Sequence, residues 1–401
     1  MAATHFDVAV VGAGMVGLAQ ACALADSELS VALIDAAQET ESETEGWDPR
    51  VVSLTQSSEE FLQSLGAWSI IRQQRCCPYR RMLVWDAEGT GSVEFTAEDL
   101  NRDSLGHIVE NRIVTRALRQ GLSGSRIKRI SASVNAVEFV GDASTKRGIL
   151  RGDGLEISAS LLIAADGASS RLRELAGLRT REWEYGHKAI VATVELEKSH
   201  EFCAWQRFAV DGPLAFLPLS EDGASNLCSI VWSLNTERAE SLLACDDNVF
   251  AAALAAAIEH RFGALKILGR RLALPLKQRH ARNYYHENLV LIGDAAHTIH
   301  PLAGQGVNLG FYDVAALSAE IDRARARNVP LCDASLARRY QRARQTHNLM
   351  AMASMEGFKR LFGSDDLRLR WLRNSGMNFV NRQSLLKKKL AALAAGKVAF
   401  G

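Results

Sequence analysis

The stretch Val8-Ala-Val-Val-Gly-Ala-Gly-Met-Val-Gly17, near the amino terminus, decides the fold class. The valine-rich run 6–11 predicts a strand that is buried on both faces. The three glycines predict a tight turn, and residues 15–24 then follow a helical apolar pattern. Residues 31–34 predict a second buried strand. The chain therefore opens as strand, turn, helix and strand, the beginning of an α/β fold.

The glycine spacing in this turn is typical of dinucleotide binding. Gly12, Gly14 and Gly17 let the backbone approach a pyrophosphate, and the helix N-terminus offers free N–H groups and a positive dipole end. Asp35 lies 21 residues beyond Gly14, at the end of the second strand, where its carboxylate can bind ribose hydroxyls. This pattern alone does not distinguish FAD from NAD.

Two further signatures follow apolar strands. Asp166 precedes a glycine after the strand 157–165, although, taken alone, this pair is more simply explained as an Asp-Gly turn that caps a helix. Gly293-Asp294 follows another buried strand, and Asp294 can bind the ribitol hydroxyls of a flavin. A glycine-rich turn then leads to a helix from Gly306, whose N-terminal dipole would stabilise negative charge on a reduced flavin.

The composition is that of an ordinary globular protein, since 47% of the 401 residues are hydrophobic and 23% are charged. The 47 basic and 46 acidic side chains give no overall field that would favour nucleic acid. From Glu320 onward, however, the chain has 17 basic side chains and only 6 acidic ones.

Seven cysteines without a CxxC pair indicate reduced thiols. Residues 8–25 carry no charge, but their glycines and the lack of a preceding Lys or Arg argue against a signal peptide or membrane span.

The rest of the chain predicts an inserted sheet and a helical end. Residues 187–276 are β-rich and partly alternating, with Asp-Gly pairs at 211–212 and 222–223, which predicts an antiparallel sheet. Residues 59–71 predict one amphipathic helix. We therefore expect an α/β protein with a Rossmann-like FAD-binding domain, an inserted antiparallel-sheet substrate domain and a helical C-terminus. The expected ranges are 1–75, 100–180 and 280–340 for the FAD-binding domain, 76–99 and 181–279 for the substrate domain, and 341–401 for the helical region.

The order GxGxxG, Asp-Gly, Gly-Asp resembles the single-component flavoprotein monooxygenases typified by p-hydroxybenzoate hydroxylase. More narrowly, the chain resembles the ubiquinone-biosynthesis hydroxylases. The sequence segments that show this resemblance are GHIVEN (106–111), LAFLPLS (214–220), CSIVWSL (228–234) and GDAAHTIHPLAGQGVNLG (293–310). The likeness extends over residues 5–380, which is nearly the whole chain.

The resemblance implies specific contacts to FAD. Asp35 would hold the adenosine ribose, although family members more often have glutamate there. Arg50 would lie beside the flavin, Asn111 would be a polar flavin contact, and Asp294 would bind the ribitol. Asp166 would support the FAD region and is associated in the family with NAD(P)H use. The other implied contacts are Gly12, Gly14, Val16 and Gly17 at the pyrophosphate, and Gly293, Pro301, Gly304, Gln305, Gly306, Val307 and Asn308 near the flavin ring.

The resemblance also implies the reaction. Reduced FAD would react with O2 to give a flavin hydroperoxide, which would hydroxylate the aromatic ring of a polyprenylphenol intermediate in ubiquinone biosynthesis. GHIVEN and CSIVWSL favour the hydroxylase that acts first, on the decarboxylated ring. Because only one GxGxxG occurs, electrons would come from NAD(P)H that binds transiently or from a partner reductase. Candidate pocket residues, each explained equally well as sheet core, are Trp205, Phe216, Leu217 and Pro218.

The sequence assigns no catalytic base and predicts no metal site. His187, His300 and Tyr185 are conceivable bases, but a lone histidine is more often a structural hydrogen-bonding residue. His297 and His300 are three residues apart, a spacing that is common by chance, and no carboxylate partner is evident.

Three alternatives stay open. The first is an FAD hydroxylase of a soluble aromatic compound, for which Arg207 is the candidate carboxylate-binding residue. The second is a non-catalytic flavoprotein subunit of a quinone-biosynthesis complex, although such a subunit would not need intact flavin signatures. The third is an NAD-dependent dehydrogenase, against which the Gly293-Asp294 signature argues.

The basic C-terminal region suggests partners besides the substrate and O2. Residues 382–397 place the lysines 387–389 beside Leu385, Leu386, Leu390 and Leu393, which favours contact with anionic lipid or with acidic ubiquinone-biosynthesis proteins. A solvated helical face explains the pattern equally well. We therefore expect a cytoplasmic protein that can associate peripherally with the inner face of the membrane and does not bind nucleic acid.

Overall fold

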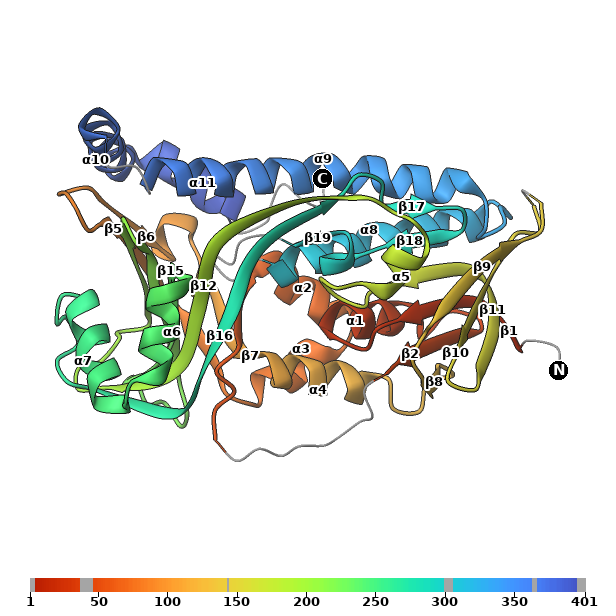
Figure 1. Cartoon of the computed structure of the whole chain (residues 1–401), viewed down its shortest axis with the longest axis horizontal. Coiled ribbons are helices and arrows are strands. Elements are labelled where there is room, and N and C mark those ends of the chain that lie inside the picture. Colours follow the sequence, from red (N-terminus) through yellow and green to blue (C-terminus); the bar gives the residue numbers. More distant parts are fainter. Residues whose placement is uncertain (1–3, 37–45, 143, 299–305, 363–365, 395–401) are drawn as a thin grey trace.

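The computed structural model describes residues 4–36, 46–142, 144–298, 306–362 and 366–394. The strands of these residues form three sheets, two of eight strands and one of three. Figure 1 shows the sheet that contains β1 at one end of the molecule and the sheet that contains β5 and β6 at the other. Two strands of 17 residues, β12 (Thr180–Leu196) and β16 (Leu265–Ala281), run between these ends.

The first sheet has a core of five parallel strands in the order β18-β11-β1-β2-β8. Val8, Ala9 and Val10 of β1 are fully buried, as the continuous apolar run predicted. Helix α1 (Met15–Leu24) connects β1 to β2, since parallel neighbours need a crossover. The strands are β1 (Thr4–Val11), β2 (Val31–Asp35), β8 (Lys128–Ser131), β9 (Ala136–Val140), β10 (Arg147–Gly152), β11 (Leu155–Ala164), β17 (Tyr285–His286) and β18 (Leu289–Leu291).

The second sheet has the order β19-β16-β12-β15-β14-β13-β5-β6. Its neighbours are antiparallel, as predicted, except that β5 and β13 run parallel, which the sequence did not indicate. One face packs against α6 (Thr236–Ala244) and α7 (Asp247–Ala257) over a core that includes Phe216, Trp232 and Phe250. The other strands are β5 (Arg81–Asp86), β6 (Ser92–Thr96), β13 (Cys203–Ala209), β14 (Gly212–Leu219), β15 (Leu227–Asn235) and β19 (His297–Thr298).

A small antiparallel sheet, β3-β7-β4, and its helices complete this part of the fold. The prediction of one helix over 59–71 is wrong: two helices lie there, separated by Gly66 with a left-handed φ of +72°. Glycine adopts this φ without strain, so the chain can turn between them. The elements are β3 (Val51–Thr55), β4 (Cys76–Tyr79), β7 (Gly106–Glu110), α2 (Gln56–Ser64), α3 (Ala67–Arg72), α4 (Asn111–Gly121), α5 (Arg171–Leu175), and the 3-10 helices η1 (Glu98–Leu100) and η2 (Gly293–Ala295).

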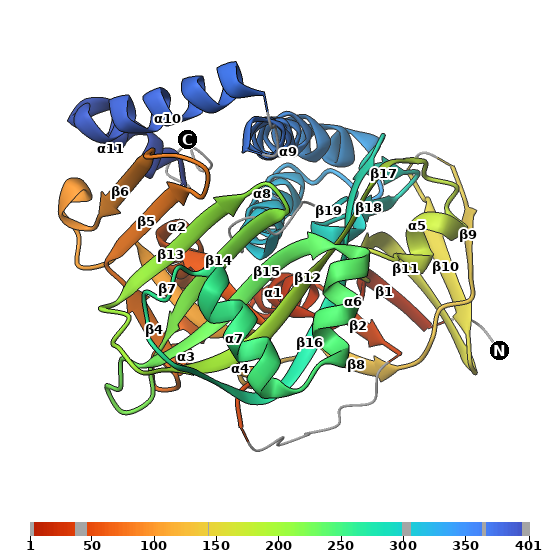
Figure 2. The ribbon, with the colours of Figure 1, turned by 60° about the vertical axis from the view of Figure 1, so that its left-hand side comes forward.

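The C-terminal region is helical, as expected, and packs on both large sheets. Helix α9 (Ala334–Phe362) lies along α8 (Gly306–Ala326), and α10 (Leu367–Arg382) covers β6, with α11 (Ser384–Ala394) beside it (Figure 2). A buried ion pair holds α10 in place, with Arg373 Nε 2.6 Å from Asp86 Oδ2 of β5. No helix of the described residues is long and apolar enough to cross a membrane. The expected fold class is confirmed.

Candidate functional site

The three sequence signatures meet at one edge of the first sheet. Gly12 follows β1, Asp166 follows β11, Gly293-Asp294 follows β18, and Asp35 is the last residue of β2. These four strands are parallel neighbours, so their carboxyl ends lie together, about 4.8 Å apart from strand to strand. Ligands of open α/β sheets bind outside the carboxyl ends of the strands. This edge is therefore the candidate cofactor site.

Each glycine of the first signature has its own structural reason. Gly12 has a φ of +106°, and a Cβ there would lie 2.3 Å from the carbonyl oxygen of Ala165. A Cβ on Gly17 would lie 1.9 Å from the carbonyl oxygen of Gly12, so helix α1 can approach the strands only because both residues lack a side chain. A Cβ on Gly14 would meet nothing within 4 Å. Gly14 therefore faces open space, from which a phosphate can approach the backbone.

The first turn of α1 is suited to an anion. Its N-cap, Gly14, makes no side-chain capping bond, and no acidic residue lies in the first turn. The Ala13 N–H donates to the carboxylate of Asp35, which ties the glycine turn to the end of β2. The N–H groups and the dipole of a helix N-terminus favour a negatively charged ligand. Asp35 thus holds the turn, in addition to the ribose contact that the resemblance implies.

Val16 joins the first signature to the third. A Cβ on Gly293 would lie 3.1 Å from Val16 Cγ1, and a Cβ on Gly310 would lie 2.6 Å from Val16 Cγ2. Gly293 also has a φ of +58°, which favours glycine. The valine therefore fits between two glycines of the Gly-Asp signature, and this packing brings α1, η2 and α8 together.

Two buried oxygen atoms of the predicted cofactor contacts, one on Asp166 and one on Asn111, lack a hydrogen-bond donor among the described residues. The Leu172 N–H donates to Asp166 Oδ2 at 3.0 Å, whereas Asp166 Oδ1 has no hydrogen-bond partner among the described residues. At the start of α4, directly after β7, Asn111 Oδ1 is also buried and has no hydrogen-bond partner within the described segments. An unsatisfied buried polar atom costs about 1–3 kcal/mol. Both oxygens therefore fit hydroxyl or amide groups of a bound cofactor such as FAD.

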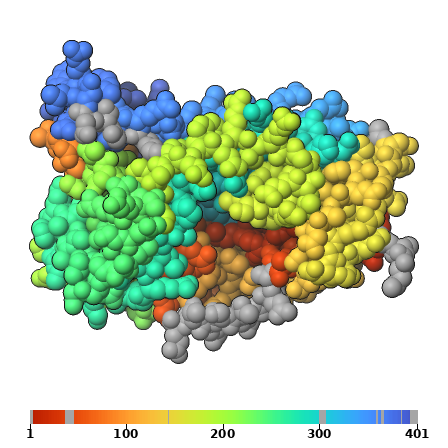
Figure 3. All heavy atoms as spheres, viewed as in Figure 1, coloured from red at the N-terminus to blue at the C-terminus, as the bar shows by residue number. Residues whose placement is uncertain are grey.

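The carboxylate of Asp294 lies deep in the molecule yet is open to solvent. Its side chain is exposed, but burial raises its pKa, with a smaller opposing effect from His297. This combination is typical of a residue on the floor of a cleft, surrounded by protein and open on one side. Figure 3 shows such a hollow near the middle of the molecule, between the red N-terminal segment and the yellow-green and teal segments.

A buried aspartate that the sequence analysis missed holds the Gly-Asp turn. Asp313 of α8 is fully buried and accepts hydrogen bonds from the Gly293 N–H at 2.9 Å and Arg344 Nε at 2.8 Å. His297 Nε2 lies 2.5 Å from the same carboxylate. Burial alone would raise the pKa of Asp313, but His297 and Arg344 hold it at about 2. An aspartate within an otherwise apolar helical run, Gly-Phe-Tyr-Asp-Val-Ala-Ala-Leu, was the available signal.

His297 therefore pairs with a carboxylate of the protein itself, that of Asp313. Among the described residues, no group of three or more His, Cys, Asp or Glu side chains could hold a metal ion. His297 Nδ1 is buried without a hydrogen-bond partner in the described segments, while Nε2 faces Asp313.

The start of α8 connects this site to β3 and α2. Asn308 Oδ1 accepts from Ser58 Oγ at 2.6 Å and from the Thr55 N–H at 3.1 Å, and Asn308 Nδ2 donates to the Ser53 carbonyl at 2.8 Å. The Asn308 side chain is thus engaged within the protein, and a cofactor contact here would use the backbone. Gly306 and Val307 precede it in the first turn of α8, whereas Pro301, Gly304, Gln305 and His300 lie outside the described residues.

Arg50 and Asn111 lie side by side, since the Asn111 N–H donates to the Arg50 carbonyl at 3.0 Å. Glu110, which directly precedes Asn111, is a second residue that the sequence analysis missed. Glu110 is fully buried, accepts the Asp48 N–H at 2.6 Å and pairs with Arg75 Nε at 3.0 Å. Glu110 therefore positions the segment that carries Arg50, whose own side chain is 53% exposed.

Three of the four candidate pocket residues lie on the side of the second sheet that faces α7. Trp205 and Phe216 have ring centroids 5.3 and 5.2 Å from the same phenylalanine beyond α7, so they belong to the core behind the second sheet. Pro218, on the same side of β14, is also buried. Leu217 points to the opposite face, because side chains alternate along a strand. Its register partner, Ser229, donates to the segment just before β3, so this face of the sheet looks toward the candidate site.

The polar candidates of the second sheet have structural partners as well. Arg207 Nε lies 3.2 Å from a carboxylate oxygen of Glu259, on the α7 side of the sheet. The Tyr185 hydroxyl donates to Glu356 at 3.0 Å, and burial, followed by this carboxylate, raises the pKa of the phenol. His187 Nδ1 lies 2.6 Å from the Tyr185 carbonyl. These contacts single out none of them as a base.

Comparison with known proteins agrees with this geometry. Residues 5–348 match the family model described as an FAD binding domain. The chain is 35% identical over 393 residues to the 3-demethoxyubiquinol 3-hydroxylase of Escherichia coli (strain K12), covering 97% of this chain and 98% of that one. It is 34% identical over 441 residues to the human mitochondrial ubiquinone biosynthesis monooxygenase COQ6, covering 98% and 93%.

Solved structures show the same fold at low identity. The p-nitrophenol 4-monooxygenase PnpA of Pseudomonas putida DLL-E4 has a TM-score of 0.77 at 16% identity and covers 99% of both chains. Klebsiella pneumoniae HpxO, crystallised with FAD and uric acid, has a TM-score of 0.75 at 18% identity and covers 98% of both chains.

Fold and site together define an FAD-dependent aromatic monooxygenase. The open glycine turn and the unsatisfied oxygens of Asp166 and Asn111 fit this cofactor. More particularly, the chain belongs to the FAD binding domain family and, within it, to the group of hydroxylases that includes the ubiquinone-biosynthesis enzymes.

Proposed function

We propose that this protein hydroxylates the aromatic ring of a polyprenylphenol intermediate in ubiquinone biosynthesis. The observation that carries the proposal is the full-length likeness to two enzymes named for ubiquinone biosynthesis, at 35% and 34% identity. The three signatures of that likeness also meet at one sheet edge. The phrases GHIVEN and CSIVWSL favour the first hydroxylation, whereas the Escherichia coli relative is named for the 3-hydroxylation of a demethoxyubiquinol. The experiment below decides between these ring positions.

The protein residues bind and orient the cofactor. The N–H groups of α1 bind the FAD pyrophosphate, Asp35 the ribose and Asp294 the ribitol, while Asp166 and Asn111 accept hydrogen bonds from the cofactor. When bound, FAD supplies the redox chemistry that joins a two-electron donor and O2 to hydroxylation of the ring. The donor is NAD(P)H or a partner reductase.

The sheet face that carries Leu217 covers the ring of the substrate. Its apolar residues suit a prenylated phenol and exclude water from the reacting atoms. This assignment uses the predicted division into an FAD-binding and a substrate domain. The bounds of β12 and β16 support that division, since the first begins at Thr180 and the second ends at Ala281, close to the predicted range 181–279.

Deletion of the gene, followed by mass spectrometry of the lipid extract, tests the proposal. We expect a polyprenylphenol that lacks one ring oxygen to accumulate, and the missing position names the reaction. Wild-type protein should restore ubiquinone, whereas Asp294→Ala should not. Asp322→Asn, an exposed carboxylate of α8, is the matched control and should restore it. An unchanged quinone pool in a host with no second hydroxylase would favour a soluble aromatic substrate instead, although Arg207 is already paired with Glu259.

We further propose that the C-terminal helices contact an anionic membrane surface. Leu367, Trp371 and Phe379 of α10 are 76%, 71% and 57% exposed, and Leu385 of α11 is 78% exposed. Exposed aromatic and leucine side chains beside basic residues are typical of helices that lie in the membrane interface. The sequence had indicated only residues 382–397, so α10 enlarges this surface.

The lysines of α11 do not contribute equally to it. Lys387 Nζ lies 2.9 Å from Asp99 of η1 and is 14% exposed, whereas Lys388 and Lys389 are exposed. Flotation with vesicles of phosphatidylglycerol and phosphatidylcholine tests this surface. Trp371→Ser and Lys388→Gln should each reduce binding to these vesicles. Equal binding of wild type and Trp371→Ser would refute the membrane contact.

A further inference from the structure

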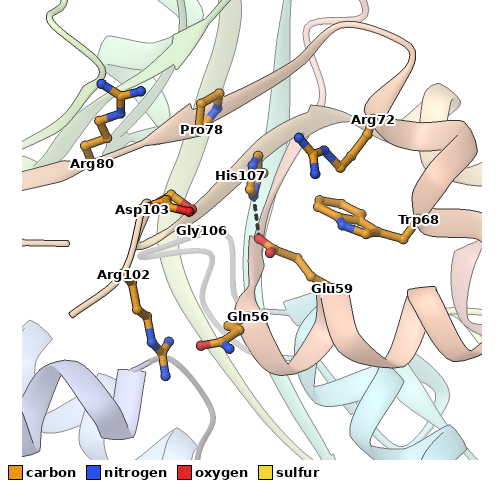
Figure 4. A pocket seen from close by; sticks show the side chains of 11 residues that line it. Gln56, Glu59, Trp68, Arg72, Pro78, Arg80, Arg102, Asp103, Gly106 and His107 are labelled. Carbon is orange, nitrogen blue, oxygen red and sulfur yellow. Dashed lines mark hydrogen bonds and ion pairs between the residues drawn. The ribbon is translucent and has the colours of Figure 1, made fainter. Parts of the chain in front are cut away.

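A cavity of about 480 Å³ lies between α2, α3, β4 and β7 (Figure 4). We call it the arginine pocket, after Arg72, Arg80 and Arg102, which line it. It lies at the first residues of β7, whereas Asn111 follows the last residue of that strand. Four residue steps of about 3.3 Å place these ends about 13 Å apart. None of the lining residues is an expected FAD contact, so the pocket is separate from the set of residues assigned to the cofactor.

Two polar atoms in the arginine pocket lack partners. Arg102 Nη1 and Gln56 Oε1 are both buried, and neither has a hydrogen-bond partner among the described residues. Figure 4 shows the two side chains next to each other at one side of the pocket. A buried guanidinium nitrogen without an acceptor and a buried amide oxygen without a donor are both costly, so a ligand that brings an acceptor and a donor would satisfy the two atoms.

The charges of the lining favour an anionic ligand. The lining includes three arginines and two acidic residues, Glu59 and Asp103, although the Arg80 guanidinium lies over the Phe202 ring, 5.5 Å from its centroid. Glu59 is already engaged, since its Oε1 lies 2.6 Å from His107 Nδ1. Guanidinium groups bind phosphate with two parallel hydrogen bonds, which makes arginine the preferred residue for such groups.

The opposite side of the arginine pocket is aromatic. The rings of Trp68 and His107 meet edge to face, with centroids 5.1 Å apart. Pro78 adds an apolar surface beside them. Flat aromatic side chains offer a stacking surface to any nucleobase. Ligand sites commonly have volumes of roughly 300–1,000 Å³, and this cavity falls in that range.

We propose that the arginine pocket binds a nucleotide, with its phosphate at Arg102 and its base against Trp68 and His107, on the side of the pocket that also carries Arg72. This site goes beyond the proposed function, because the one GxGxxG motif of the chain is assigned to FAD and a second nucleotide would need a site of its own. Two kinds of ligand contain the required phosphate joined to a planar base. One is a pyridine nucleotide that delivers electrons, and the other is an adenine nucleotide that only binds.

Isothermal titration of the FAD-loaded protein with ADP, NADH and NADPH tests the proposal. We expect at least one of them to bind, and Arg102→Gln to weaken that binding about tenfold or more, since it removes a charge-assisted hydrogen bond. Trp68→Leu should weaken nucleotide binding but not the binding of inorganic phosphate. Arg116→Gln, which removes an exposed arginine of α4, is the control and should bind as wild type does.

The outcomes are distinguishable. Tighter binding of NADH or NADPH than of ADP identifies a pyridine nucleotide, and equal binding identifies an adenine nucleotide. The FAD content of each variant, read from its absorbance, reports independently on the fold and on the cofactor site. If Arg102→Gln does not fold, Arg102→Lys replaces it, since it keeps the charge but removes the planar guanidinium and should also weaken nucleotide binding. Absence of nucleotide binding, or an affinity unchanged in the arginine variants, would overturn the proposal.

Discussion

Replacement of Asp313 by asparagine tests whether the buried carboxylate organises the cofactor site. The pKa of Asp313 lies at about 2 instead of 3.8, and each pKa unit corresponds to about 1.4 kcal/mol, so the carboxylate contributes about 2 kcal/mol at neutral pH. The substitution also leaves Arg344, which is 3% exposed, without its partner. Breaking a buried pair in this way costs about 3–5 kcal/mol. We therefore expect Asp313→Asn to lose about 3 kcal/mol of unfolding free energy.

The pH dependence has a definite sign. Because the pKa of Asp313 is lower in the folded protein, its contribution is present above pH 3.8 and is lost as the pH falls toward about 2. The difference between wild type and Asp313→Asn should therefore be full at pH 7 and shrink below about pH 4. The FAD content should also fall, since the Gly293 N–H loses a charged acceptor.

Urea denaturation at several pH values and the flavin absorbance of the purified protein check this prediction. Asp322→Asn, on the exposed side of the same helix, controls for the loss of one negative charge. If Asp313→Asn unfolds at the same urea concentration as Asp322→Asn and retains FAD, the carboxylate does not organise the site and the reasoning fails.

Four other substitutions probe three separate parts of the fold. Gly12→Ala should lower the Tm of the FAD-free protein, because its Cβ would meet a backbone carbonyl. Gly14→Ala should leave that Tm unchanged and weaken FAD binding. Equal Tm values for Gly12→Ala and wild type would contradict the first claim. Glu110→Gln should reduce FAD content and kcat more than it raises the substrate KM, and a change in KM alone would show that it does not position the Arg50 segment. Arg373→Met should cost about 3–5 kcal/mol in urea denaturation and expose α10 to limited proteolysis, and unchanged proteolysis would show that the buried ion pair does not fix that helix.

The sequence by itself determined the elements and motifs that depend on local pattern. The apolar runs predicted the strands of the first sheet, and the glycine spacing predicted the turn at Gly12, because that φ and that close approach are available only to glycine. The Asp-Gly and Gly-Asp pairs were found because each follows a buried strand. Parallel topology then implies that such residues share an edge.

The tertiary structure decided what depends on contacts between distant segments. Asp313 and Glu110 lie in an apolar helix and at the end of a strand, and only the folded chain brings Arg344 and Arg75 to them. The alternation along β13 and β14 was visible in the sequence, but the face that α7 covers was not, so the sequence left open whether Trp205 lines a pocket or belongs to the sheet core. The periodic spacing of apolar residues shows which side chains share one face of a helix or strand. It does not show which other element covers that face, because this depends on packing between segments that are far apart in the chain.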